Sequence, residues 1–207
     1  PIEAFDPHEF PCHIGGECTD FDPSEYFDRK AARRMSRFAQ LAVVAAREAV
    51  ANAGLDLESL DRERAGVVLG NGNGGFPDIE ETCRTLFDRG GMRMSPIFLP
   101  RILPNMAAAN VAMQFGLGGY NTTVVTACAA GTQAIGEASD IIRNGRADLV
   151  LTGGTESGFS PLGLGGFAVM RALTSRSDDP HGASRPFDGD RDGFVPSEGA
   201  GVLILES

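Results

Sequence analysis

The segment Val124–Gly136, VVTACAAGTQAIG, places a single cysteine between a β-branched run and an apolar stretch with helical spacing. Residues 121–127 (NTTVVTA) are typical of a strand, and residues 129–145 (AAGTQAIGEASDIIRNG) are typical of a helix closed by a glycine. Residues 147–154 (ADLVLTGG) are typical of a second, buried strand. This order predicts a βαβ unit in a parallel sheet of an α/β protein, with Cys128 at its first junction.

Cys128 admits two interpretations. A helix N-terminus presents unpaired N–H groups and a positive partial charge, which stabilise a thiolate and can hold the oxyanion formed when a thioester is attacked. The small residues on both sides, Ala127 and Ala129, leave room for a substrate. A free cysteine can equally be a buried, inert packing group. The hydrolase elbow G-x-[SC]-x-G is absent because Thr126 occupies its first glycine position.

The rest of the chain supplies further elements. Residues 1–28, rich in Pro, Asp and Phe, are expected to form a surface loop. A helix is predicted over 29–53 with Gly54 as its C-cap, followed by a buried strand over 65–71. Helices are also predicted over 79–91 and from about 104 to 115, the latter after a proline-broken loop, and a last strand lies within 194–207.

Composition limits the function classes. The net charge of −10 argues against a nucleic-acid binder, and no apolar run approaches the roughly 18 residues of a membrane helix. Cys12, Cys18, Cys83 and Cys128 form no C-x-x-C pair, so we expect free, solvent-near thiols, no metal site and a reduced, cytoplasmic setting. Both ends look truncated, because the chain starts with Pro1 and stops in a strand-like segment.

Several longer motifs carry a family resemblance. These are RKAARRMSRFAQLAVVAAREAV (29–50), SPIFLPRILPNMAAANVAMQFGLGG (95–119), TACAAG (126–131), GRADLVLTGGTES (145–157), SPLGLGGFAVMRALTSR (160–176) and ASRPFDGDRDGFVPSEGAGVLILE (183–206). Together they span nearly the whole chain, which closely resembles the β-ketoacyl-ACP synthase II type of condensing enzyme in the thiolase-like superfamily. The block over 161–206 is specific to the fatty-acid and polyketide branch.

The resemblance implies a layered αβαβα fold built from two duplicated halves and usually present as a homodimer. Residues 1–207 would be mostly the first half, an N-terminal ketosynthase domain incomplete at both ends. Cys128 would accept the acyl group from an acyl carrier protein and its backbone N–H would bind the oxyanion. A malonyl-carrier thioester would then lose CO2 and condense with the acyl group, without a cofactor, in fatty acid or polyketide elongation.

The resemblance also implies two histidines and a lysine that match no position in this chain. His8, His13 and His181 lie elsewhere in the pattern, so we expect loop roles for them and no condensation by the chain alone. An alternative is a non-condensing partner or decarboxylase-like subunit of a polyketide assembly. The presence of Cys128 favours a working synthase, because chain-length-factor subunits usually lack that cysteine.

A basic stripe is predicted on the helix over 29–53. Lys30, Arg33, Arg34 and Arg37 fall at i, i+3, i+4 and i+7, on one helical face. The stripe is either an ordinary solvated face or a docking surface for the acidic acyl carrier protein. The resemblance favours docking and implies these carrier-docking residues: Lys30, Arg33, Arg34, Arg93 and Arg171.

The glycine-rich segment LGNGNGGF (69–76) has the spacing of a dinucleotide-binding loop. Phe76-Pro77 follows it, so it does not open directly into a helix as that motif requires. The resemblance instead places the segment at the acyl pocket, with Asn73 where many relatives carry a bulky apolar residue. It also implies that Phe167 gates the pocket beside Cys128; the alternative for Phe167 is a simple core position.

Overall fold

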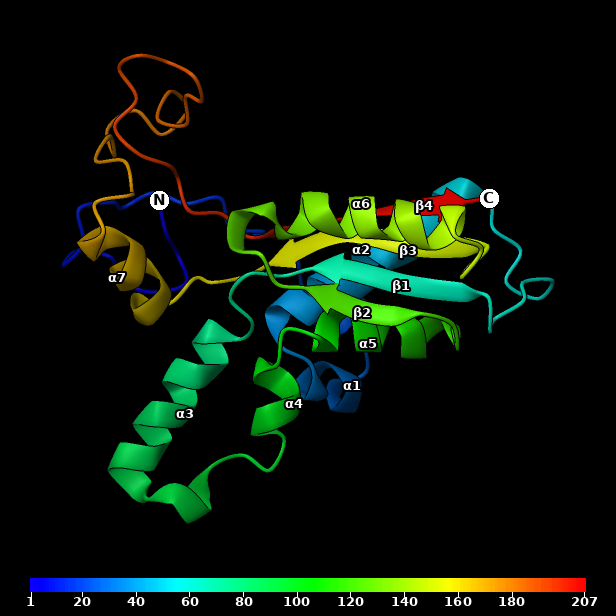
Figure 1. Cartoon of the computed structure of the whole chain (residues 1–207). Helices are drawn as coiled ribbons and strands as arrows, with labels where there is room; N and C mark the ends of the chain where they lie inside the picture. The colour runs from blue at the N-terminus through cyan, green and yellow to red at the C-terminus, as the bar shows by residue number, and fades with distance from the viewer.

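The computed structural model describes all 207 residues and is organised around one four-stranded sheet (Figure 1). The strands are β1 (Ala65–Gly70), β2 (Asn121–Val124), β3 (Leu149–Glu156) and β4 (Gly199–Glu206), in the order β2-β1-β3-β4. The first three are parallel, and β4 is antiparallel to β3. The predicted βαβ unit is confirmed as β2, α6 (Ala130–Arg143) and β3, with β1 inserted between its two strands.

Helices cover both faces of the sheet. Helix α6 lies on one face, and α2 (Arg37–Ala53) and α5 (Met106–Phe115) lie on the other (Figure 1). Strand residues alternate between the two cores: Val67 and Leu69 pack toward α2 and α5, while Val68 packs toward α6. The chain therefore forms three layers, α, β and α. No helix combines the length and apolar character needed to cross a membrane.

Shorter elements surround the carboxyl ends of the parallel strands. Helix α3 (Phe76–Arg89) and α4 (Phe98–Ile102) extend away from the sheet, and α7 (Pro161–Val169) lies beyond the ends of the strands (Figure 1). Helix α4 occupies the stretch for which we expected a proline-broken loop. The remaining helical segments are α1 (Arg29–Arg34), η1 (Pro23–Glu25), η2 (Gly91–Arg93) and η3 (Ala127–Ala129).

The N-terminal segment is irregular, as predicted, but it is not simply a surface loop. Ile2, Cys12 and Ile14 are buried in a third apolar cluster that includes Leu164 of α7 and Leu173. Cys12 is fully buried, so the expectation of a solvent-near thiol was wrong for this residue. The sequence pattern has no period here, because the burial depends on contacts with residues far along the chain.

The helix predicted over 29–53 is two helices. Asp28 caps α1 through hydrogen bonds from the backbone N–H groups of Lys30 and Ala31, and Met35 is extended and buried between α1 and α2. The break removes Arg37 from the predicted basic stripe. The C-cap prediction is confirmed, because Gly54 adopts the left-handed conformation with φ of 60°.

Arg37 turns inward instead of joining the stripe. Its guanidinium donates to both carboxylate oxygens of Glu198, with Nη2–Oε1 at 2.8 Å, and to the carbonyl oxygen of Cys18 at 2.7 Å. The Glu198 side chain is only 3% exposed and also accepts from the Ser157 hydroxyl. This ion pair joins the N-terminal segment, α2 and the residues before β4.

Candidate active site

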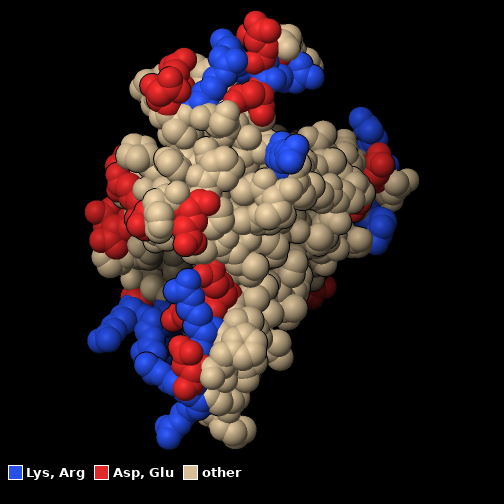
Figure 2. Space-filling model, turned by 90° about the vertical axis from the view of Figure 1, so that its left-hand side faces the viewer, with Lys and Arg blue, Asp and Glu red and all other residues tan.

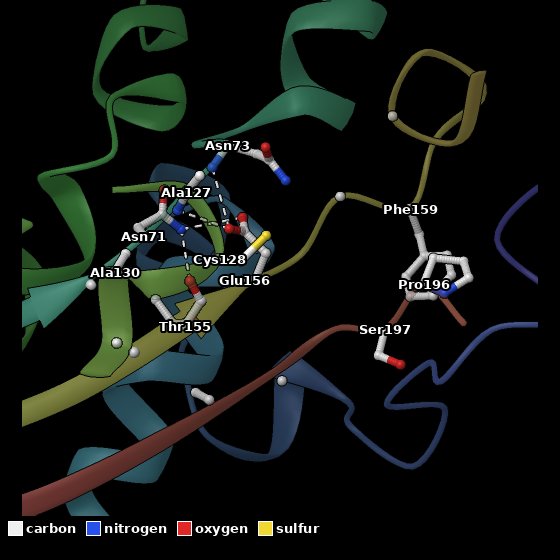
Figure 3. Close-up of a pocket in the computed structure, with 18 of the residues that line it drawn as sticks. Asn71, Asn73, Ala127, Cys128, Ala130, Thr155, Glu156, Phe159, Pro196 and Ser197 are labelled. Carbon is white, nitrogen blue, oxygen red and sulfur yellow. Dashed lines mark hydrogen bonds between the residues drawn. The ribbon is translucent and has the colours of Figure 1, made fainter. Parts of the chain in front are cut away.

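A cavity of about 560 Å³ opens at the carboxyl ends of the parallel strands (Figure 3). In open α/β sheets, ligands bind in a crevice outside the carboxyl ends of the strands. The lining comes from the loop after β1, the start of α6, the end of β3, α7 and the segment before β4. It includes Asn71, Asn73, Cys128, Glu156, Phe159, Phe167, Phe194, Pro196 and Ser197.

Cys128 faces this cavity from η3, the single turn between β2 and α6. Ala127 just before it has φ of 50°, an uncommon conformation for a residue with a side chain. The turn exposes Cys128 at the strand-to-helix junction, and its side chain is solvent-accessible. The thiol is therefore not a buried packing group, which removes the second interpretation that the sequence left open.

Glycines bring the start of α6 directly onto the sheet. A Cβ on Gly70, at the end of β1, would lie 2.2 Å from the carbonyl carbon of Ala130, the first residue of α6. A Cβ on Gly154 of β3 would lie 3.1 Å from the Cα of Gly131. The absence of side chains at these two strand positions lets the helix start close to the strand ends, which places its N-terminal turn at the cavity.

A carboxylate that the sequence reasoning did not identify holds the loop after β1. Glu156 Oε2 accepts from the backbone N–H of Gly72 at 2.8 Å and of Asn73 at 3.2 Å (Figure 3). Its Oε1 accepts from Asn71 Nδ2 at 3.3 Å. Burial raises the pKa of Glu156, and these hydrogen bonds to its charged form oppose the increase. The sequence signal that could have identified Glu156 is a charged residue at the end of a predicted buried strand.

The two predicted pocket residues line the same cavity as Cys128. Asn73 enters from the glycine-rich loop, which opens directly into α3 at Phe76. The expectation that Phe76-Pro77 separates this loop from a helix was wrong, because a proline is tolerated in the first turn, where the backbone N–H has no helical partner. Phe167 enters from α7 and stacks edge-on against Phe194, with ring centroids 5.3 Å apart. The structure thus brings together three side chains that are widely separated in the sequence.

The predicted docking residues lie outside the cavity on three separate elements. Lys30, Arg33 and Arg34 are exposed on α1, Arg93 ends η2 and Arg171 follows α7. Lys and Arg side chains, with Asp and Glu side chains between them, occupy the lower left of the face in Figure 2, at the height of α1, α3 and α4. None of the three histidines lines the cavity; His8 pairs with Asp6 in an exposed loop.

The fold and the exposed cysteine at the strand-to-helix junction define a thiolase-like α/β protein. More specifically, the chain belongs to the β-ketoacyl synthase family, because residues 2–207 match the model described as "Beta-ketoacyl synthase, N-terminal domain".

Individual relatives agree with this family. The chain is 47% identical over 206 residues to 3-oxoacyl-[acyl-carrier-protein] synthase 2 of Synechocystis, covering 100% of this chain and 50% of that protein. The ishigamide ketosynthase/chain length factor is similar in structure, with a TM-score of 0.88, 34% identity, and 100% and 50% of the two chains covered. A type II polyketide ketosynthase in complex with its acyl-carrier protein is also similar in structure, with a TM-score of 0.77 and 29% identity. This similarity covers 92% of this chain and 52% of that chain. The chain spans about half the length of the curated relatives it matches.

Proposed function

We propose that the complete protein is a 3-oxoacyl-[acyl-carrier-protein] synthase in which Cys128 accepts the acyl group. The observation that carries the proposal is the exposed thiol of Cys128 in a cavity at the start of α6. The relatives named 3-oxoacyl-[acyl-carrier-protein] synthase 2, at 45–47% identity, support this chemistry.

The proposed reaction has two transfers. The Cys128 thiolate attacks the carbonyl of an acyl-carrier thioester, and the carrier's thiol leaves. A malonyl-carrier thioester then loses CO2, and the resulting carbanion attacks the acyl-cysteine carbonyl. This releases the Cys128 thiolate and a 3-oxoacyl thioester that is two carbons longer. The backbone N–H of Cys128, at the positive end of α6, would bind the oxyanion, and Asn73 and Phe167 would form walls of the acyl pocket.

Intact-mass measurement on the complete protein tests the first transfer. Incubation with an acyl-carrier thioester should add one acyl group to the wild type and none to Cys128→Ala. Acylation that persists in Cys128→Ala would overturn the assignment. Adding malonyl-carrier to the acylated enzyme should then yield a 3-oxoacyl product.

A second candidate is a non-condensing or decarboxylase-like subunit of a polyketide assembly. The similarity to the ishigamide ketosynthase/chain length factor favours it over unrelated functions. The malonyl step separates the two candidates, because this subunit would release CO2 without forming a carbon–carbon bond. The identity to the synthase 2 relatives makes fatty acid elongation our first choice of pathway.

For the carrier protein we propose a docking surface formed by Lys30, Arg33, Arg34, Arg93 and Arg171. The three basic residues of α1 form no ion pair with an acidic side chain of the fold, unlike Arg37, so their charge is available to an acidic partner. The ketosynthase solved with its acyl-carrier protein supports a carrier as that partner. Reversing Arg33 and Arg34 to Glu should raise the apparent KM for the carrier substrate at low salt.

The matched control is Arg143→Glu, which reverses an exposed charge at the last residue of α6, remote from its N-terminal turn. An unchanged KM in the Arg33 and Arg34 double variant, or an equal rise in the control, would contradict the docking surface.

We also propose a homodimer in the cytoplasm. Strand β2 lies at the edge of the sheet. Two apolar side chains near this edge are exposed: Val125, directly after β2, by 54%, and Met113, on α5, by 67%. Four free thiols suit a reducing compartment. Sedimentation of the complete protein at the mass of a monomer would contradict the dimer.

A further inference from the structure

The loop between β1 and α3 is held by two side chains, Glu156 and Asn71, instead of by backbone acceptors. The N–H groups of Gly72, Asn73 and Gly74 donate only to side-chain acceptors: the first two to Glu156 Oε2, and the third to Asn71 Oδ1 at 2.7 Å. Hydrogen bonds to an ionised acceptor are about twice as strong as neutral ones. Two of the three successive backbone groups, those of Gly72 and Asn73, are therefore held by Glu156, and the third is held by Asn71.

Asn71 completes this arrangement. Its side chain is 1% exposed, and its Nδ2 donates to the carbonyl oxygen of Thr155 at 2.7 Å as well as to Glu156. Beyond the loop, the next backbone hydrogen bonds are those of Asn71 N–H to Val124 and Gly75 N–H to Ile102. Residues 72–74 have no other backbone attachment through their N–H groups.

We propose that Glu156 is a positioning residue that fixes the 71–74 loop, and through it the Asn73 side chain, in the wall of the Cys128 cavity, and thereby determines which acyl groups the cavity accepts. The inference rests on the proposed function. It follows from two observations: Asn73 and Cys128 line one cavity, and the backbone of Asn73 is held by Glu156, which lines the same cavity (Figure 3).

Two substitutions of Glu156 break its hydrogen bonds to the loop in different ways. Glu156→Gln keeps the length but replaces one acceptor by an NH2 group, which must face either Asn71 Nδ2 or the two loop N–H groups, all of them donors. Glu156→Asp keeps the charge but withdraws the carboxylate by about 1.5 Å, beyond hydrogen-bond reach of the loop. Both variants should release the loop.

The test compares acylation of Cys128 by butyryl-carrier and dodecanoyl-carrier thioesters in the complete protein, followed by intact mass. Each Glu156 variant should change the ratio of the two rates by about tenfold, within the range of coupling between residues in contact. In an Asn73→Ala background the same Glu156 substitutions should change the ratio much less, because the side chain that they displace is already absent. Alkylation of Cys128 by iodoacetamide, a small probe, should change little.

Asp148→Asn is the matched control. Asp148 is also a hydrogen-bonded carboxylate, paired with Arg64, but it precedes β3 at the opposite end of the strand from Glu156. Its loss should leave the ratio unchanged. If Glu156→Gln does not fold, Glu156→Asp provides the measurement.

The outcomes are distinguishable. An unchanged ratio in a folded Glu156 variant, or effects of Glu156 and Asn73 that simply add, would overturn the positioning role while leaving the proposed function intact. A wild type that takes up no acyl group on Cys128 would overturn the proposed function, and the inference with it.

Discussion

The contact between Gly70 and the start of α6 yields the sharpest prediction of stability and reactivity together. In Gly70→Ala the new Cβ would lie 2.2 Å from the carbonyl carbon and 2.4 Å from the carbonyl oxygen of Ala130. Non-bonded carbon atoms prefer separations of about 3.5–4.0 Å, so the helix start must withdraw by about 1.3 Å. The obstructing atoms are helix backbone, which cannot rotate aside as a side chain can.

The magnitude follows from this geometry. Overpacking usually costs about 1–3 kcal/mol, and a clash with backbone belongs at the upper end, so we expect the free energy of unfolding to fall by about 3 kcal/mol. Because η3 and Cys128 connect β2 to the displaced helix, the thiol should move with it. A displacement of about 1 Å can cost about 100-fold in rate, so acylation of Cys128 should slow by up to that factor.

Urea unfolding measures the first effect, and intact-mass acylation kinetics measures the second. Gly136→Ala is the control: this residue lies within the same helix, and a Cβ there would meet nothing within 4 Å. It should stabilise the protein by up to about 1 kcal/mol through helix propensity, with acylation unchanged. If Gly70→Ala unfolds at the same urea concentration as the wild type and is acylated at the same rate, the close approach of α6 to β1 is wrong.

Two further predictions concern buried carboxylates. Glu198→Ala removes the partner of Arg37, whose side chain is 36% exposed, and should lower the free energy of unfolding by about 2–3 kcal/mol. A loss in urea unfolding no larger than that of the exposed Asp148→Ala would contradict this. Burial raises the pKa of Asp78 from 3.8 to about 6, although Arg101 opposes the shift. Because the folded pKa is raised, the associated stability is present in full below the unfolded pKa of 3.8 and is lost as the pH rises through about 6. The stability of the wild type relative to Asp78→Asn should therefore fall by about 2 kcal/mol from pH 4 to pH 7. A relative stability in urea that is constant over this range would refute it.

The elements that sequence patterns located well are those defined by local periodicity. The strand, helix and strand around Cys128 were predicted because strand and helix periods change abruptly at that point. Gly54 was predicted as a cap because a left-handed helix end favours glycine. The break at Met35 was missed, because α1 and α2 share a continuous helical pattern and the break depends on the burial of Met35 and on the contact between Arg37 and Glu198.

The sequence alone determined that a cysteine stands between a strand and a helix, and its longer motifs pointed to the family that the comparisons then established. Only the tertiary structure placed Asn73 and Phe167 in one cavity with Cys128, inserted β1 between β2 and β3, and brought Glu156 to the loop after β1. The physical reason is how far apart along the chain the interacting residues lie. Local patterns follow from the backbone period and from glycine conformation, whereas these contacts join residues from separate elements and depend on strand order and on the close approach of helix to sheet.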